Sequence, residues 1–265
     1  MDERRLTQTP PLWDTHVHLD QLPHPRSAVQ RAIDAGVTTW VLVATSPYSY
    51  KTQSRLLKTG AFSGIQHIRA VGLHPEVDHP ADALHSVWSI IHNEPIAAIG
   101  EIGLPVYRQL SRAAFNRNWE WLHIQLSWAE QRQLPVIIHA VHQSCEPMLR
   151  ILEDFPHIPR VVFHWLKAPL DLVQEMIARH YFVGITPDVI WRERDQNLLS
   201  LWPPHQILLE TDAPWPHRQD RQDGEPAEIR ALTDFLDTWS PQPSSWRKIA
   251  IHNALAFFVP SDSRI

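Results

Sequence analysis

The sequence predicts a (β/α)₈ barrel of the TIM type, and three observations lead to this fold class. Eight short apolar runs recur along the 265 residues. These runs are too short for helices and too uniformly apolar for strands with one wet face, which is typical of buried parallel strands. Longer segments with helical spacing separate them, and eight such units over about 250 residues is the usual size of the barrel. An open, doubly wound sheet is the alternative.

The eight predicted strands follow one another along the whole chain. They are LWDTHVH (12–18), TTWVLVA (38–44), IRAVGLH (68–74), IAAIGEI (96–102), PVIIHA (135–140), RVVFHW (160–165), YFVGIT (181–186) and QILLETD (206–212). Two of the intervening segments have clear helical stripes. The stripe in 113–133 contains Phe115, Trp119, Leu122, Leu126 and Ala129, and that in 228–239 contains Ile229, Leu232 and Leu236. No linker or repeat interrupts this alternation, so we expect one domain over 1–265, with residues 1–10 as a flexible N-terminal extension.

The composition excludes several classes of protein. The apolar fraction of 43% and charged fraction of 20% are typical of a globular protein, without the long apolar run of a membrane span. A single cysteine, Cys145, cannot form an internal disulfide, and the first residues lack the apolar centre of a secretory signal, so we expect a cytoplasmic protein without membrane contact. The glycines form no dinucleotide or P-loop motif, and no serine elbow is present. The oligomeric state stays open, with a monomer slightly favoured.

The net charge is −5, from 24 Lys and Arg against 29 Asp and Glu. The chain as a whole therefore does not attract nucleic acid. A polyanion would have to bind at a local site, for which a metal centre is the most plausible form.

Two histidines one residue apart, His16 and His18, end the first apolar run. In an extended strand their side chains project from the same face, about 6.5 to 7 Å apart along the backbone. That spacing suits two ligands of one metal ion and equally suits two exposed polar residues. Because the chain has 17 histidines, the motif by itself is weak.

Titratable residues recur at the ends of the other predicted strands. With the first pair, the set comprises His16, His18, Glu101, His139, His164 and Asp212, while His74 ends the third run. In a parallel barrel all strand C-termini open onto the same face, where catalytic groups gather. A buried ionised group without compensation costs several kcal/mol, and divalent cations would supply the compensation. The pattern predicts a metal site at this face.

The chain resembles the TatD family of metal-dependent hydrolases, within the amidohydrolase superfamily. The resemblance rests on motifs in matching order: DTHVHLD (14–20), VGLHP (71–75), AIGEIGL (98–104), LPVIIHA (134–140), VVFHW (161–165), ILLETDAPW (207–215), EPAEI (225–229) and HNALAFF (252–258). It implies a barrel with two divalent metal ions that hydrolyses phosphodiesters, typically as a DNA exonuclease. By position, His16, His18 and Asp212 would hold one ion, His139 and His164 the other, and Glu101 would bridge them.

The ligand types indicate the metal and the chemistry. Imidazole with carboxylate suits Zn²⁺ or Mn²⁺, whereas Mg²⁺ prefers oxygen ligands; all three ions stay candidates. Two neighbouring ions can activate a shared water and stabilise the leaving oxygen. We expect Asp212 to take the proton from that water while Glu101 holds the ions together.

Departures from the family pattern lie at the rim of the site. Pro105 stands where the family commonly has Asp, Val141 (followed by His142) where it has Arg, and WLKAP (165–169) where it often has a Phe-Ser-Gly turn. The missing arginine weakens the grip on a phosphate. The basic residues Lys167, Arg218 and Arg221 could replace it or be solvated surface charges.

Four residues are candidate substrate contacts: His74, Trp165, Trp215 and Arg218. The tryptophans could stack on a base or pack in the core, and His74 could contact substrate or support a ligand. The leading function is a metal-dependent exonuclease acting on DNA, or on RNA. The alternatives are hydrolysis of an ester, amide or lactone, for example in aminoacyl-tRNA deacylation, and a non-catalytic barrel subunit of a larger complex.

Overall fold

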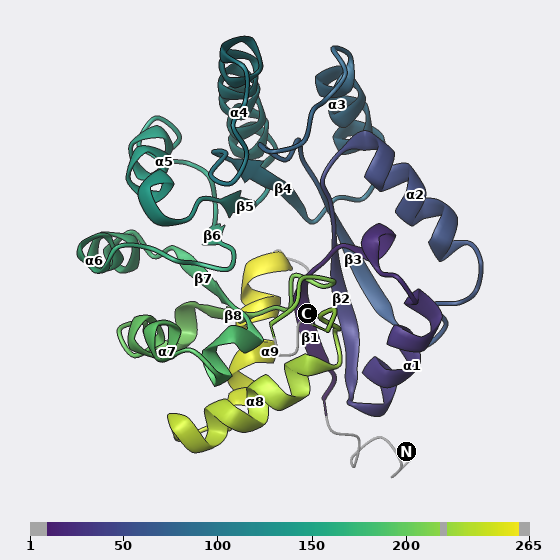
Figure 1. The fold of residues 1–265 in the computed structure, drawn as a ribbon, viewed down its shortest axis with the longest axis vertical. Coiled ribbons are helices and arrows are strands. Elements are labelled where there is room, and N and C mark those ends of the chain that lie inside the picture. Colours follow the sequence, from purple (N-terminus) through teal and green to yellow (C-terminus); the bar gives the residue numbers. More distant parts are fainter. Residues whose placement is uncertain (1–9, 218–221, 260–265) are drawn as a thin grey trace.

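A computed structural model describes residues 10–217 and 222–259 of the chain (Figure 1). Within them lie eight strands, one in each predicted run: β1 (Leu12–Val17), β2 (Val37–Ala44), β3 (Gln66–Val71), β4 (Ala98–Gly103), β5 (Val136–His139), β6 (Val161–Phe163), β7 (Phe182–Ile185) and β8 (Ile207–Leu209). The predicted extension over residues 1–10, apart from Pro10, lies outside the described residues. None of the described helices is long and apolar enough to cross a bilayer.

The strands form a barrel in chain order. Every neighbouring pair from β1 to β8 is parallel. The barrel closes just beyond β8, where Val17 of β1 bridges Ala213 and the amide of Asp212 donates to the carbonyl of His16 at 3.0 Å. The predicted (β/α)₈ barrel is confirmed, and the open doubly wound sheet is excluded.

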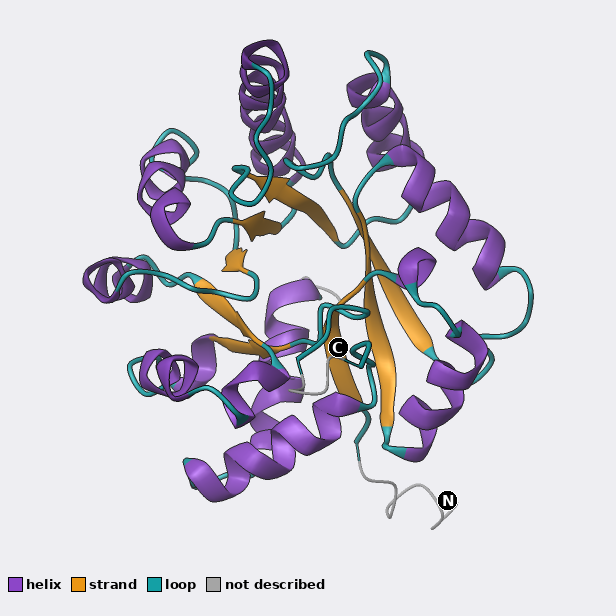
Figure 2. Ribbon diagram, in the orientation of Figure 1, coloured by secondary structure: helices purple, strands orange, loops and turns teal. Residues whose placement is uncertain are grey.

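Helices surround the strands (Figures 1 and 2). They are α1 (Pro25–Asp34), α2 (Pro47–Leu57), α3 (Ala83–Asn93), α4 (Arg112–Arg132), α5 (Cys145–Leu152), α6 (Leu170–Ala178), α7 (Glu193–Leu199), α8 (Glu228–Trp239) and α9 (Trp246–Phe258). Local sequence explains several starts: Pro25 and Pro47 occupy the first turns of α1 and α2, where a missing amide costs nothing. Ser111 caps α4, since its hydroxyl accepts from the amide of Ala114.

The buried face predicted for α8 is confirmed, whereas that predicted for α4 is partly wrong. In α8 the predicted residues Ile229, Leu232 and Leu236 are all buried. In α4 the predicted stripe is wrong at its first two positions, because Phe115 and Trp119 are exposed. The buried face passes instead through Trp121 and Gln125, and the Gln125 side chain accepts a hydrogen bond from the amide of Leu73 at 2.8 Å. This hydrogen bond to the loop after β3 helps to orient α4, with Gln125 on the side that faces the barrel.

Two apolar cores result from the alternation of side chains along the strands. The larger lies between the strands and the surrounding helices. The smaller one contains strand residues such as Trp13, Val43 and Leu208 together with Phe257 of α9. Since these residues face away from the outer helices, they fill the barrel interior, and α9 closes one end of it. In Figure 1 α9 lies inside the ring of the other helices.

Candidate metal centre

All six predicted metal-binding residues lie together at the C-terminal end of the barrel. Five different strands, or the residues directly after them, contribute the side chains: His16 and His18 at β1, Glu101 in β4, His139 in β5, His164 after β6 and Asp212 after β8. All six are buried, the most accessible being His139 at 8% exposure. The strand ends therefore bring distant parts of the sequence into one cluster.

The Glu101 carboxylate lies between two sets of histidines. Its Oε2 atom is 3.4 Å from Nε2 of His16 and 3.7 Å from Nε2 of His18. Its Oε1 atom is 2.5 Å from Nδ1 of His139 and 2.6 Å from Nε2 of His164. The two oxygens of one carboxylate thus face different ligand pairs.

Asp212 completes the first set. Its Oδ1 atom is 3.0 Å from Nε2 of His18 and 3.6 Å from Nε2 of His16. Potential ligand atoms of His16, His18 and Asp212 all lie within 4.8 Å of one another, as do those of His16, Glu101 and His164. These residues form a candidate metal-binding cluster, and His16 lies in both groups.

His74 approaches the cluster from the loop after β3. The predicted third strand extends to this residue, but β3 ends at Val71. The Nε2 atom of His74 is 3.2 Å from Oε1 of Glu101, and His74, Glu101 and His139 form a third group of close ligand atoms. His74 is therefore placed to join the metal ligands as well as to contact substrate.

The hydrogen bonds of the cluster suit a bound cation. The Nδ1 atom of His18 lies 3.0 Å from the carbonyl oxygen of Val43, which can only accept, so Nδ1 carries a proton and Nε2 is the nitrogen that a metal ion would bind. Several other buried atoms have no hydrogen-bond partner: both ring nitrogens of His16, Nε2 of His139 and Nδ1 of His164. Divalent cations would satisfy such atoms, so this donor set fits metal binding.

The electrostatics of the cluster favour ionised carboxylates. Burial raises the pKa of Asp212, but its hydrogen bond with His18 and the neighbouring imidazoles outweigh burial and hold the pKa below its ordinary value. Burial also raises the pKa of Glu101, but the charges of His164, His74 and His139 outweigh burial and hold this pKa well below the usual range. Both carboxylates are therefore negative at neutral pH.

The histidines of β1 differ in their protonation. Burial lowers the pKa of His16 to about 4, and repulsion from His164 acts in the same direction. Burial also opposes charge on His18, but the hydrogen bond and negative charge of Asp212 raise its pKa to about 9. A metal ion would compete with the proton of His18, so metal affinity should fall as the pH falls.

Three carboxylates beside the cluster, two buried and one partly buried, were missed by the sequence reasoning. The first is Glu210, whose Oε1 atom accepts from the amide of Trp165 at 2.5 Å and lies 3.7 Å from Nδ1 of His164. Gly184 of β7 leaves room for it, because a Cβ there would lie 2.3 Å from the carboxylate. Burial raises the pKa of Glu210 well above its ordinary value. The sequence contained a signal for this residue, because Glu210 directly follows a buried strand and lies two positions before Asp212.

Asp14 and Glu76 are the other two. Asp14 accepts from the amides of His16 and Thr211 and from the Thr211 hydroxyl, which joins the first and last strands near Asp212. Glu76 accepts from the amides of Val106 and Tyr107 at 2.7 and 2.8 Å and lies 3.5 Å from Nε2 of His139. It fixes the loop that contains Pro105. No local pattern marked Glu76, because its partners are backbone groups of another loop.

The predicted substrate contacts at the rim are only partly placed. Trp215 is 53% exposed, which excludes the core-packing interpretation for this residue, whereas Trp165 is partly buried and its ring centroid is 6.5 Å from that of Trp215. Lys167 is not a solvated surface charge, since its side chain is 10% exposed and pairs with Asp188 at 3.2 Å. The predicted contact Arg218 and the nearby Arg221 lie outside the described residues.

A barrel with a buried cluster of histidines and carboxylates at its C-terminal face defines the class of metal-dependent hydrolases. The chain belongs to the TatD-related DNase family, whose model matches residues 13–259. The chain is therefore an enzyme of the metal-dependent hydrolase class. The family resemblance seen in the sequence motifs is confirmed.

Relatives of known sequence or structure agree. An uncharacterized metal-dependent hydrolase from Haemophilus influenzae is 30% identical over 85% of this chain and 90% of its own length. The 3′-5′ ssDNA/RNA exonuclease TatD from a Pantoea species is 29% identical over 87% of this chain and 91% of its own length. The crystal structure of the TatD homologue YjjV from Escherichia coli K12 has a TM-score of 0.80 at 25% identity, covering 94% of this chain and 98% of that chain.

Proposed function

We propose that this chain is a two-metal-dependent exonuclease that hydrolyses phosphodiester bonds of DNA from a strand end, with RNA as a second substrate. The proposal rests on the position of the Glu101 carboxylate, whose two oxygens face different pairs of histidines. Oε2 faces His16 and His18, whereas Oε1 faces His139 and His164. A carboxylate in that position suits a bridge between two cations.

The ligands divide accordingly. His16, His18 and Asp212 would hold one ion, His139 and His164 the other, and Glu101 both. The mixture of imidazole and carboxylate favours Zn²⁺ or Mn²⁺ over Mg²⁺. Two ions bound there would lower the pKa of a water molecule and stabilise the leaving oxygen of an in-line displacement.

Asp212 is the proposed proton acceptor. Its carboxylate is ionised at neutral pH and lies among the proposed metal ligands. His18 holds the Oδ1 atom of Asp212 in place, because its Nε2 atom lies 3.0 Å away while its Nδ1 atom is fixed by Val43. A proton can therefore move to Asp212 from a water bound beside it.

Exposed aromatic rings near the site support a single-stranded nucleic acid as substrate. Tyr107 is 67% exposed, Trp191 54% and Trp215 53%, and all three lie in segments that follow barrel strands. Such rings can stack on bases without sequence preference. The exonuclease names of relatives such as that from Pantoea favour the same substrate.

The first test uses protein that is stripped of metal and resupplied with Mg²⁺, Mn²⁺ or Zn²⁺. End-labelled single-stranded DNA and RNA are the substrates, and the His16→Ala/His18→Ala variant is the control. We expect metal-dependent shortening from one end that is absent in the control. Bound metal is counted in parallel, with about two ions expected per chain.

Two outcomes would contradict the proposal in different ways. Failure to cleave with any metal, despite two bound ions, would exclude the nuclease and direct the search to esters, amides and lactones. Failure to bind metal would instead favour a non-catalytic barrel subunit.

A further inference from the structure

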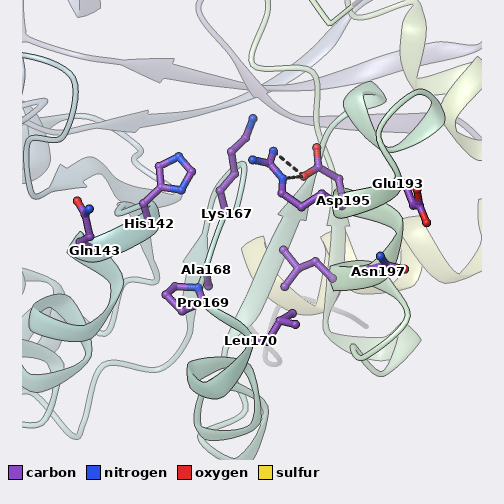
Figure 3. A pocket seen from close by; sticks show the side chains of 11 residues that line it. His142, Gln143, Lys167, Ala168, Pro169, Leu170, Glu193, Asp195 and Asn197 are labelled. Atoms are coloured by element: carbon purple, nitrogen blue, oxygen red, sulfur yellow. Dashed lines mark hydrogen bonds and ion pairs between the residues drawn. The ribbon is translucent and has the colours of Figure 1, made fainter.

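A cavity of about 530 Å³ opens among the segments that follow β5, β6 and β7 (Figure 3). The loop after β5 contributes His142, the loop after β6 contributes Lys167, and α7 contributes Arg194 and Asp195. The two loops are joined, because the amide of His142 donates to the carbonyl of Lys167 at 2.7 Å. In Figure 3 the Lys167 side chain lies between His142 and Asp195.

Hydrogen bonds connect the cavity wall to the metal centre. Asp188, buried in the 3₁₀ turn after β7, accepts from Nζ of Lys167 at 3.2 Å and from Nε1 of Trp165 at 3.0 Å. Trp165 directly follows the candidate ligand His164. The Nδ1 atom of His217 lies 3.6 Å from Asp188, and its Nε2 atom contacts the carbonyl of Thr211, next to Asp212. Lys167 is therefore held in a fixed position relative to both metal-binding loops.

Positive charge exceeds negative charge in this network. The single carboxylate of Asp188 is shared by Lys167 and by Arg192, whose Nη1 atom is 2.8 Å away. Arg194 pairs with Asp195 at 2.8 Å, yet its side chain stays 58% exposed. Lys167, Arg192 and Arg194 thus share two carboxylates.

The remaining titratable groups near the cavity are Glu193, His142 and His217. In Figure 3 the remaining acidic residue of the wall, Glu193, lies beyond Asp195 and away from Lys167. Burial lowers the pKa of His142, and the charges of Arg194 and Lys167 lower it further against the opposing effect of Asp195. The pKa of His217 is raised: burial opposes its charge, but Asp188 favours it more strongly. Lys167 and Arg194 are the two cations of the lining, and of its two carboxylates, Asp195 and Glu193, the latter lies farther from Lys167.

We propose that Lys167 and Arg194 form a subsite for an internucleotide phosphate next to the phosphodiester being hydrolysed. This inference rests on the proposed nuclease function and adds the residues that hold the strand. A partly buried, hydrogen-bonded lysine loses little conformational freedom when an anion binds, and an exposed arginine can move to close a bidentate contact. The volume of the cavity admits a phosphate with its sugar.

The test compares two substrates that differ in the neighbouring phosphate. Bis(p-nitrophenyl) phosphate has one phosphodiester and no neighbour, whereas a ten-residue oligothymidylate has several. In Lys167→Met and in Arg194→Gln we expect kcat/KM on the oligonucleotide to fall by about tenfold or more, since a charge-assisted hydrogen bond is lost. Turnover of the small diester should stay within about twofold of the unmodified enzyme, and Lys167→Arg should recover part of the loss. Lys248→Met, an exposed lysine on α9 at the closed end of the barrel, is the matched control.

Binding provides a readout independent of activity. In metal-free protein, the dependence of fluorescent oligonucleotide binding on salt should weaken in Lys167→Met, the logarithmic slope falling by about 0.7 for one lost phosphate contact. Equal losses on both substrates, or an unchanged salt slope, would overturn the proposal. So would inhibition by inorganic phosphate that depends on Lys167 while oligonucleotide kinetics do not change, because the cavity would then take a free phosphate.

The two proposals fail separately. If the unmodified enzyme cleaves neither substrate with any metal, the nuclease function is wrong, and the salt slope still decides whether the cavity binds a phosphate backbone. If cleavage is robust but Lys167 and Arg194 variants behave as Lys248→Met does, only the subsite is wrong.

Discussion

At the scale of single residues, the metal centre consists of groups whose burial is unfavourable until a cation binds. His16 and His164 are almost fully buried, yet both ring nitrogens of the former and Nδ1 of the latter lack hydrogen-bond partners. A buried polar group without a partner typically costs about 1–3 kcal/mol. These side chains therefore weaken the metal-free protein and become favourable only through the ion that they bind.

Asp212→Asn tests the proposed proton acceptor. Asparagine has nearly the same shape but cannot take a proton, so we expect turnover to fall to below about a tenth of the unmodified rate while the fold persists. Oligonucleotide cleavage and far-ultraviolet circular dichroism measure the two properties. Asp154→Asn, an exposed residue between α5 and β6, is the matched control and should leave both unchanged. Retention of most activity in Asp212→Asn would assign proton transfer to another group.

At the scale of elements, α9 stabilises the barrel at the end remote from the chemistry. Its Asn253 side chain is buried and donates to the carbonyls of Pro204 and Ile207, both at 2.7 Å. These contacts hold the start of β8, while Phe257 fills the barrel interior from the same helix. Stability and chemistry are thus assigned to opposite ends of the strands.

Asn253→Ala should lower the free energy of unfolding by about 2–4 kcal/mol, because a buried carbonyl and a partly buried carbonyl lose their donor. We expect kcat on the small diester to stay within about twofold at a temperature where the variant is folded, since the metal centre lies at the other end. Urea unfolding and steady-state kinetics measure these effects. His252→Ala, an exposed neighbour on α9, is the control. A variant with normal stability but poor turnover would contradict this division of roles.

The existence of each strand could be predicted from the sequence more accurately than the residue at which the strand ends. Apolar runs marked all eight strands, because burial on both faces leaves a continuous apolar signal. That signal continues past the last paired residue, so β3 was extended to His74 and β8 to Asp212 although they end at Val71 and Leu209. The six clustered side chains followed from the common direction of parallel strands. Lys167 and Glu76 did not, since their partners depend on how separate loops meet.

At the scale of the whole molecule, metal binding and folding stability should be coupled. The cluster joins side chains from β1, β4, β5 and the ends of β6 and β8, so a bound ion links distant parts of the chain. A ligand at about 100 times its dissociation constant stabilises the folded state by about 2.7 kcal/mol.

Removal of metal should therefore lower the melting temperature. For a chain of this size we expect a fall of about 5–10 °C with a chelator and full recovery when Mn²⁺ or Zn²⁺ is returned. Differential scanning calorimetry measures the change, and His16→Ala/His18→Ala provides the comparison. Because that variant lacks two proposed ligands, its melting temperature should respond much less to metal. An equal response in both proteins would place the stabilising ion elsewhere.

The candidate ligands stand on or directly beside the barrel strands, whereas the cavity wall with Lys167 and Arg194 belongs to loops and to the short helix α7. Strand positions are fixed by every neighbour in the sheet, while loops can be exchanged at little cost to the framework. The residues proposed for catalysis and the residues proposed for substrate recognition therefore lie in separate parts of this chain. Grafting other loops after β5, β6 and β7 onto the same barrel offers a route to hydrolases with new preferences that keep the original metal chemistry.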